Sequence, residues 1–198
     1  MLTIVHEGNA VELNPDTLII IEHATLEEYE KLANEDLKID FDGERIYIHS
    51  PATLRHEELV YDILTVCKHY FESHPDLGIP TGSHFAIHLP NDRRPEPDVV
   101  VIPAGLISPN ESTFHGVPLL VVEVISPSTR RHDLEEKKNW YMENQVPEIW
   151  LVDPDEESLT ALYLTADGIY DEVSTTTDIL ASRFFEGLEF SATILFKE

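Results

Sequence analysis

Cysteine and long apolar runs are both nearly missing from this sequence. Its 198 residues include one cysteine, Cys67. A single cysteine excludes an internal disulfide and fits a reducing compartment. No apolar run approaches the roughly 20 residues that a membrane-spanning helix needs. The start MLTIVHEGNAVEL also lacks the basic and apolar segments of a secretory signal. We therefore expect a cytoplasmic protein that has no membrane partner.

Positive charge is scarce too, with 13 Lys and Arg against 38 Asp and Glu and a net charge of −25. A surface of this charge repels nucleic acid. The charge is uneven, however, because the stretch from Arg93 to Lys138 contains six basic and seven acidic residues. Such a locally neutral region is compatible with weak binding of a polyanion, or with a metal ion that supplies positive charge. The acidity could equally serve solubility alone.

Several catalytic motifs are absent. The sequence contains no GxSxG, no P-loop glycine pattern, no dinucleotide fingerprint and no paired CxxC. Serine hydrolase, nucleotide hydrolase and zinc-binding interpretations therefore have no support. The ten histidines are scattered along the chain.

Apolar periodicity predicts a mixed α/β fold with helices on a sheet. Thr25 and Glu28 have capping-box spacing at the start of a short helix. Further helices are expected over 53–73 and 131–144, and a β-hairpin over 37–49 with a tight turn at Asp42-Gly43. Strands are expected over 18–22 (packed on the core), 78–89, 98–103, 117–125, 146–154, 159–165 and 169–174, with a surface loop over 104–116 and a final hairpin.

Glu123 is the most informative single residue, because it lies inside the apolar run LLVVEVI. This run predicts a central strand that is buried on both faces. An ionised carboxylate there must be paired, protonated or bound to a metal. If the following helix folds back on the strand, Lys137 comes level with Glu123, and Asp98 can join them from a neighbouring strand.

Two carboxylates and a backbone carbonyl form the oxygen-rich site that Mg²⁺ or Mn²⁺ prefers. A nearby lysine could then orient or activate an attacking water. A purely structural interpretation stays open, because Glu123 could be the buried ion-pair partner of Lys137 or Arg130. Asp133 and Lys137 also have favourable i, i+4 spacing.

The chain resembles the Uma-two family of restriction endonucleases, within the PD-(D/E)XK nuclease superfamily. The resemblance extends from about residue 20 to 195. It runs through TLEEYEKL, the hairpin DGE, the helix with His56 and PEPDVVVIP, and its most specific part is EVISPSTRRHDLEEK followed by VPEIWLVDP. It implies a restriction-endonuclease-like mixed β-sheet flanked by helices, with an N-terminal helix and β-hairpin. We expect one domain over 1–198, formed by an N-terminal extension (1–22) and an endonuclease-like domain (25–195) with its core at 53–153.

By this resemblance, Asp98 and Glu123 bind the metal and the backbone carbonyl of Val124 is a third ligand. The superfamily pattern places a lysine two residues after the acid, where this chain has Ile125. The family lysine is displaced to the following helix, which fits Lys137.

The long helix would contribute either His56 or Glu57 to the site, and the alternative stays open. For Glu57, a favourable interaction with the helix dipole is a sufficient explanation of an acid in the first turn.

These expectations describe an endonuclease that hydrolyses phosphodiester bonds in DNA with Mg²⁺ or Mn²⁺. The alternative is a non-catalytic interaction protein on the same fold, with a structural Glu123–Lys137 ion pair. Because the sequence has no basic recognition helix, DNA contact could depend on oligomerisation, and we allow for a homodimer.

Overall fold

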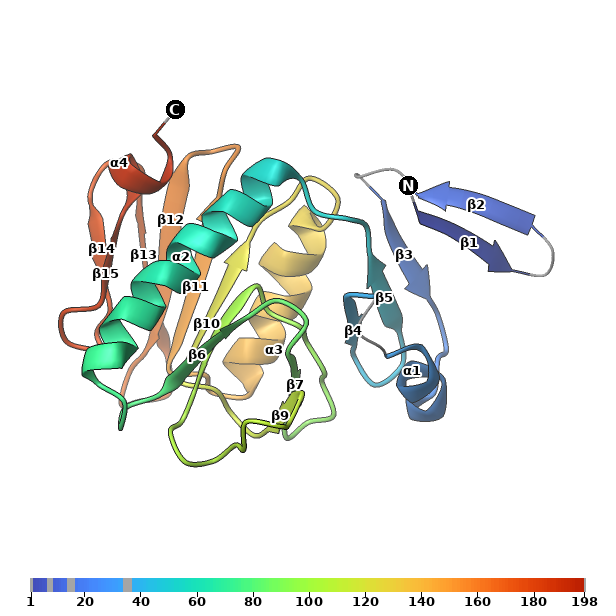
Figure 1. The fold of residues 1–198 in the computed structure, drawn as a ribbon, viewed down its shortest axis with the longest axis horizontal. Coiled ribbons are helices and arrows are strands. Elements are labelled where there is room, and N and C mark those ends of the chain that lie inside the picture. The colour runs from blue at the N-terminus through green and yellow to red at the C-terminus, as the bar shows by residue number, and fades with distance from the viewer. Residues whose placement is uncertain (1, 7–8, 14–16, 34–36, 198) are drawn as a thin grey trace.

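A six-stranded sheet forms the centre of the computed structural model, which describes residues 2–6, 9–13, 17–33 and 37–197 (Figure 1). The strand order is β13-β12-β11-β10-β8-β6. Only β10 and β11 are parallel, and the other neighbours are antiparallel. The strands are β6 (Ile79–Gly82), β8 (Val99–Ile102), β10 (Leu120–Val124), β11 (Glu148–Asp153), β12 (Ser158–Leu164) and β13 (Tyr170–Thr175). The predicted central strand is confirmed, because all five residues of β10 are buried between β11 and β8.

Helices pack on both faces of this sheet. Helix α2 (Leu54–Ser73) crosses one face, where Leu59 and Ile63 contact the cluster around Val122 and Val124. On the opposite face, Val121 belongs to a second cluster with Tyr141 of helix α3 (Lys138–Glu143). Successive strand residues point to opposite faces. Asp98 and Glu123 therefore face α3, while Val99, Val122 and Val124 face α2.

The predicted helix over 131–144 is confirmed, but its first half is π-helical. The π-helical segment η1 (His132–Lys137) continues directly into α3. The backbone N–H of Lys138 donates to the carbonyl of Asp133, five residues earlier. This wider winding changes which side chains face the sheet, and Lys137 is among those turned inward. π-Helical turns are rare and are frequent at functional sites.

A smaller three-stranded sheet lies beside the main sheet (Figure 1). Its order is β3 (Leu18–Ile21), β5 (Ile46–His49) and β4 (Ile39–Phe41), and helix α1 (Leu26–Leu32) packs on it through Tyr29. The capping box is confirmed, because Thr25 Oγ1 accepts from the N–H of Glu28 and the Glu28 carboxylate accepts from the N–H of Thr25. The hairpin is also confirmed.

One local expectation needs correction. The hairpin turn spans four residues rather than two, because Phe41 pairs with Ile46, and within it Gly43 adopts a positive φ of 94°. Strand β3 packs on the core as expected, because Leu18 and Ile19 contact the buried clusters, although it lies at the sheet edge and Ile20 is 45% exposed. Residues 1, 7–8 and 14–16 of the predicted extension lie outside the described residues.

The expected strand over 78–89 is divided into β6 and β7 (Ala86–His88), which belong to different sheets. His84 lies between them with φ 63°, so the chain changes direction there. The expected loop over 104–116 contains β9 (Thr113–His115), which pairs in parallel with β7.

Short elements complete the fold at both ends. Strands β1 (Leu2–His6) and β2 (Asn9–Leu13) form an antiparallel pair. The final hairpin, expected over 159–174 around Asp167-Gly168, is confirmed as β12 with β13. After it, β14 (Ile179–Ala181) pairs with β15 (Glu189–Ser191), and helix α4 (Ala192–Leu195) follows. In the part of the chain that the structure describes, no helix is long and apolar enough to cross a membrane.

Candidate active site

Asp98 and Glu123 come from neighbouring strands. In the β8–β10 pair Val99 lies opposite Val122, and continuing this register by one residue places Asp98 opposite Glu123. Directly opposed residues in an antiparallel pair have Cβ atoms about 5 Å apart. Both side chains are almost completely buried, at 2% and 1% exposure.

The two acids line one cavity of about 290 Å³. Val124, His56 and Glu57 also line it, so all the residues that the sequence points to as ligands or helix contributions surround the same space. Lys137 is fully buried behind Glu123 and reaches the cavity only through that carboxylate.

Glu123 holds a cation and a phenol on one oxygen. Its Oε1 lies 2.6 Å from Lys137 Nζ and accepts a 2.5 Å hydrogen bond from the hydroxyl of Tyr141. The contact with Lys137 lacks hydrogen-bond alignment, so it is mainly an attraction between charges. Burial raises the pKa of Glu123 to about 7, and neighbouring Asp98 adds to this while Lys137 opposes it.

Asp98 is held by three groups. Its Oδ1 lies 2.5 Å from Lys38 Nζ, its Oδ2 accepts from the N–H of Val124 at 2.8 Å, and His56 Nε2 lies 3.3 Å from Oδ2. Burial alone would raise the pKa of Asp98, but Lys38 and His56 outweigh it and hold the pKa well below its usual range. Asp98 is therefore ionised, and its carboxylate carries the fixed negative charge of the site.

Lys137 is the buried cation that connects several acids. Besides Glu123, its Nζ lies 3.7 Å from Asp133 Oδ1 and 3.8 Å from Asp40 Oδ2. Burial alone would lower its pKa, but Asp40, Glu123 and Asp133 together raise it. Arg130, the other partner considered for Glu123, instead pairs with Asp153 at the end of β11.

The two candidates on α2 are placed differently. The side chain of His56 is 10% exposed and points at Asp98, whereas that of Glu57 is 59% exposed at the rim of the cavity. Thr53 caps this helix by accepting from the N–H of His56, which fixes the first turn. His56 is thus the residue of α2 that touches one of the two acids.

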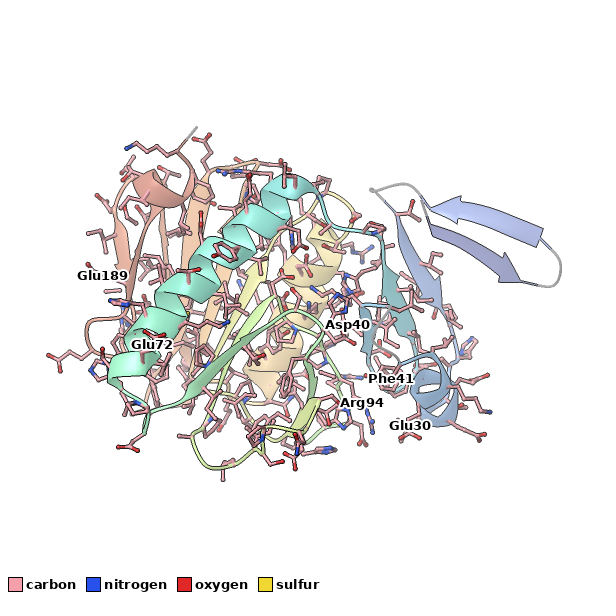
Figure 2. The ribbon with its side chains drawn as sticks, in the orientation of Figure 1. Glu30, Asp40, Phe41, Glu72, Arg94 and Glu189 are labelled. Carbon is pink, nitrogen blue, oxygen red and sulfur yellow. The ribbon has the colours of Figure 1, made fainter. Side chains whose placement is uncertain are left out.

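A second buried cluster surrounds Asp40, and the sequence reasoning missed it. Asp40 Oδ2 lies 2.6 Å from His49 Nε2 and 3.0 Å from His132 Nε2, while Oδ1 accepts from the N–H of Glu96 at 2.7 Å. The other ring nitrogen of His132, Nδ1, lies 2.6 Å from Glu136 Oε2. Figure 2 labels Asp40 at the junction between the small sheet and the main body.

Burial is the largest effect on the pKa of each group in this cluster, and hydrogen bonds and neighbouring charges oppose it. Burial alone would lower the pKa of His132, but hydrogen bonds to Asp40 and Glu136 raise it to about 9. The pKa of His49 is lowered, because burial outweighs its attraction to Asp40. Asp40 itself is held well below its usual pKa by Lys137 and the two histidines, against the effect of burial.

Some of the missed residues left a signal in the sequence. Tyr141 follows Lys137 by four residues and so shares its helix face. Lys38, Asp40 and His49 left none, because they come from a hairpin distant in sequence from Asp98 and His132.

Two donor sets could hold a metal ion. Asp98, Glu123 and the carbonyl of Val124 offer oxygens, which suit Mg²⁺ or Mn²⁺. They fit such an ion, because Lys137 and Tyr141 both contact Oε1 of Glu123, which leaves Oε2 for an ion, although an ion would have to displace Lys38 from Asp98. Among the described residues, Asp40, His49 and His132 are the single group of three His, Cys, Asp or Glu side chains with ligand atoms within 4.8 Å of one another.

Comparisons with known proteins place the fold. A structure titled "Crystal structure of a putative nuclease belonging to DUF820 from Anabaena variabilis ATCC 29413" aligns with a TM-score of 0.71 at 18% identity, covering 87% of this chain and 97% of that one. At this identity the match shows the fold alone. A search of the curated proteins found no match.

The family model of Uma2, described as "Putative restriction endonuclease", matches residues 26–193. This match includes both acids, Lys137, α2 and all six strands of the main sheet. The match spans most of the chain and includes the elements that build the cavity. The chain therefore belongs to the Uma2 family, and its mixed sheet flanked by helices is a nuclease-like fold.

Proposed function

We propose that this protein is a metal-dependent endonuclease that hydrolyses phosphodiester bonds in DNA. The observation that carries the proposal is that Asp98 and Glu123, from two neighbouring strands, line one cavity, while Lys137 from the following helix contacts Glu123 from behind. Family membership and the nuclease-like fold support the reaction class.

The acids and the lysine would have separate roles. Asp98, Glu123 and the Val124 carbonyl would hold Mg²⁺ or Mn²⁺, which when bound supplies positive charge to the phosphate and acidifies water. His56 positions Asp98 through its 3.3 Å contact. Lys137 keeps Glu123 ionised and oriented, and it stabilises negative charge that develops beside Glu123.

The chemistry required is a hydrolysis. A water oxygen forms a bond to phosphorus, the bridging P–O bond breaks, and the leaving oxygen takes up a proton. Burial raises the pKa of Glu123, so its carboxyl must release a proton before an ion binds. The proton of the attacking water would pass to solvent, and the bound ion and Lys137 would stabilise the negative charge that remains.

DNA is the proposed substrate, although the chain carries a net charge of −25. Within the site, Asp40, Glu96, Asp98, Glu123 and Asp133 are buried, and Lys38 and Lys137 contact all of these acids except Glu96. The carboxylates thus outnumber the lysines, and a bound divalent cation would reduce the repulsion of a phosphate. A homodimer that widens the contact surface stays part of the proposal.

A cleavage assay tests this function. We expect wild-type protein to cleave plasmid DNA with Mn²⁺ or Mg²⁺ and to lose activity when the metal is chelated. Glu123→Gln should lower the rate by about 10²–10³-fold, the usual cost of removing one group that stabilises charge in the transition state. Glu148→Gln is the matched control, because Glu148 is equally buried at 1% exposure but is bonded to Arg183 and Phe184 at the opposite end of the strands.

A non-catalytic interaction protein is the second candidate. The observation that favours it is the complete burial of Lys137, which forms an ion pair that could be purely structural. On this alternative no metal-dependent cleavage is detected, Mn²⁺ leaves the melting temperature unchanged, and Glu123→Gln destabilises the protein without metal. A metal-dependent rise in melting temperature that disappears in Asp98→Ala would reject it.

A further inference from the structure

Three elements bring their side chains to a single oxygen. Asp40 comes from β4, His49 from β5 and His132 from η1, and both histidines approach Asp40 Oδ2 through Nε2, at 2.6 and 3.0 Å. Their ligand atoms lie within 4.8 Å of one another. Asp40 is fully buried, and His132 is 2% exposed.

The hydrogen bond on the far side of His132 decides what its Nε2 can offer. Glu136 accepts at Nδ1 over 2.6 Å, so the proton of a neutral ring lies on Nδ1 and Nε2 presents a lone pair to Asp40. In the absence of a metal ion, the 3.0 Å contact with Asp40 therefore requires a second proton on Nε2, and a metal ion between the two atoms would take the place of that proton. A carboxylate on the outer nitrogen of a histidine is also the usual support of a metal-ligating imidazole.

Charge and access also favour a cation. Asp40, Glu96 and Asp133 add to the acids Asp98 and Glu123, and Lys38 and Lys137 contact four of these five carboxylates, all but Glu96. The ammonium of Lys137 is 3.8 Å from Asp40 Oδ2 but 2.6 Å from Glu123, so Glu123 is its main partner. His49 lines the 290 Å³ cavity, which gives an ion a route to the cluster.

The donor set selects the kind of metal. Two imidazoles and one carboxylate are the ligands of several zinc centres, which leave a fourth position for water. Imidazole nitrogen suits Zn²⁺ and its transition-metal neighbours, whereas Mg²⁺ prefers oxygen alone. The cluster therefore differs in chemistry from the oxygen-rich pair of Asp98 and Glu123.

We propose that Asp40, His49 and His132 bind one transition-metal ion of the Zn²⁺ class, at a site separate from Asp98 and Glu123. The ion ties the β4–β5 hairpin to η1, the segment that carries Lys137. It thereby holds the small sheet against the main body and fixes the position of the lysine. The site does not depend on whether the protein cleaves DNA.

Equilibrium dialysis of the metal-free full-length chain against Zn²⁺, in excess Mg²⁺ to occupy the oxygen donors, tests this proposal. We expect one tightly bound Zn²⁺ per chain in the wild type and in Asp98→Asn. His49→Gln and His132→Gln should lose this equivalent, while His69→Gln on the exposed face of α2 should keep it. Zn²⁺ should also raise the melting temperature of the wild type but not of His49→Gln.

The supporting carboxylate gives a second readout. Glu136→Gln keeps all three ligands, and loss of such an outer partner typically weakens metal affinity by about 10–100-fold. If hydrogen bonds alone hold the cluster together, Glu136→Gln should leave the affinity for Zn²⁺ unchanged. If His132→Gln fails to fold, His49→Gln decides, because its side chain lies at the cavity wall.

The proposal is overturned if Zn²⁺, Co²⁺ and Ni²⁺ all fail to bind stoichiometrically to the wild type. It is equally overturned if one equivalent persists in His49→Gln with unchanged affinity. If Asp98→Asn is the only variant that loses the bound Zn²⁺, the ion belongs to the Asp98 and Glu123 site instead.

Discussion

The Glu123–Lys137 pair is the residue-scale feature on which both candidate functions depend. Each side chain is at most 1% exposed, and Tyr141 occupies the same oxygen of Glu123. A buried pair of this kind is costly to break, because the remaining charge has no partner. It therefore has a structural consequence whether or not it takes part in catalysis.

We expect Lys137→Met to lower the free energy of unfolding by about 3–5 kcal/mol, the usual cost of removing one partner of a buried ion pair. The double variant Glu123→Gln/Lys137→Met should recover much of this loss, because no charge is left unpaired. Urea denaturation of both variants measures it. Lys138→Met is the control, since Lys138 pairs with Glu172 at the surface. Equal stability of Lys137→Met and wild type would contradict the ion-pair interpretation.

Lys38 occupies the oxygen of Asp98 that a metal ion would need. Its Nζ lies 2.5 Å from Oδ1, and its side chain is 17% exposed. Lys38→Met should therefore bind Mn²⁺ severalfold more tightly than wild type, as measured by the Mn²⁺ concentration that gives half of the maximal thermal shift. Lys31→Met, at an exposed pair with Glu27, is the control. Weaker binding in Lys38→Met would show that the lysine supports the metal site instead of competing with it.

At the scale of elements, the sequence predicted the features that depend on residues close together along the chain. The capping box of α1 needed only Thr25 and Glu28, three residues apart. The π-helical winding of η1 could not be predicted, because it depends on Lys137 reaching acids from β4 and β10. Tertiary contacts therefore overrode the regular helix that periodicity predicts.

We expect Thr25→Ala to destabilise the protein by about 1 kcal/mol, the typical value of an N-cap side chain. The loss arises because the N–H of Glu28 loses its acceptor, Thr25 Oγ1, and the Glu28 carboxylate loses the hydroxyl that donates to it. Chemical denaturation measures it. Thr25→Ser keeps the hydroxyl and should restore most of the stability, and a similar loss in Thr25→Ser would point to packing rather than capping.

The β7–β9 pair places His88 beside His115, with ring centroids 4.3 Å apart. Burial, helped by Arg94 and His115, lowers the pKa of His88 to about 4. The pKa of a histidine is about 6.5 in the unfolded chain and is lower here in the folded chain, so folding favours the neutral form of the ring. Its contribution is complete above pH 6.5 and is lost as the pH falls towards 4.

His88→Gln should therefore flatten the decrease in melting temperature between pH 6.5 and 4, relative to wild type. His69→Gln, on the exposed face of α2, serves as the control. Identical pH profiles for wild type and His88→Gln would show that folding does not lower the pKa of His88.

At the scale of the whole molecule, two apolar clusters clamp the main sheet from both sides. Leu59 of α2 is fully buried in the cluster on one face. Leu59→Ala should cost about 2–5 kcal/mol, because it leaves a cavity between helix and sheet. Denaturation with an unchanged m-value would confirm that the fold persists. Leu106→Ala, at a side chain 65% exposed, should change stability little.

The small sheet joins the main body through few backbone contacts, of which the bridge between Phe41 and Arg94 is one (Figure 2). Side chains complete the junction, because Lys38 reaches Asp98, while Asp40 reaches His132 and Lys137. That all 198 residues form one domain stays a prediction. The active-site geometry nevertheless requires the small sheet, which supplies the cation on Asp98.

The sequence by itself determined the order of the main elements and the residues at the centre of the site. Glu123 lies in a strand that is buried on both faces, and Lys137 lies in the helix that follows this strand. The sequence could connect the two residues because they are close together along the chain. Asp98 could join them because apolar strands of this kind share one sheet.

Only the tertiary structure decided which distant groups complete the site. Lys38, Asp40 and His49 come from a separate hairpin, and their positions depend on how two sheets pack, which no local pattern encodes. The choice of His56 over Glu57 as the contact of Asp98 likewise follows from the rotation of α2 on the sheet. A buried charge requires a partner, wherever in the sequence that partner lies. The packing of the two sheets therefore decided which groups pair with Asp98 and which pair with Asp40.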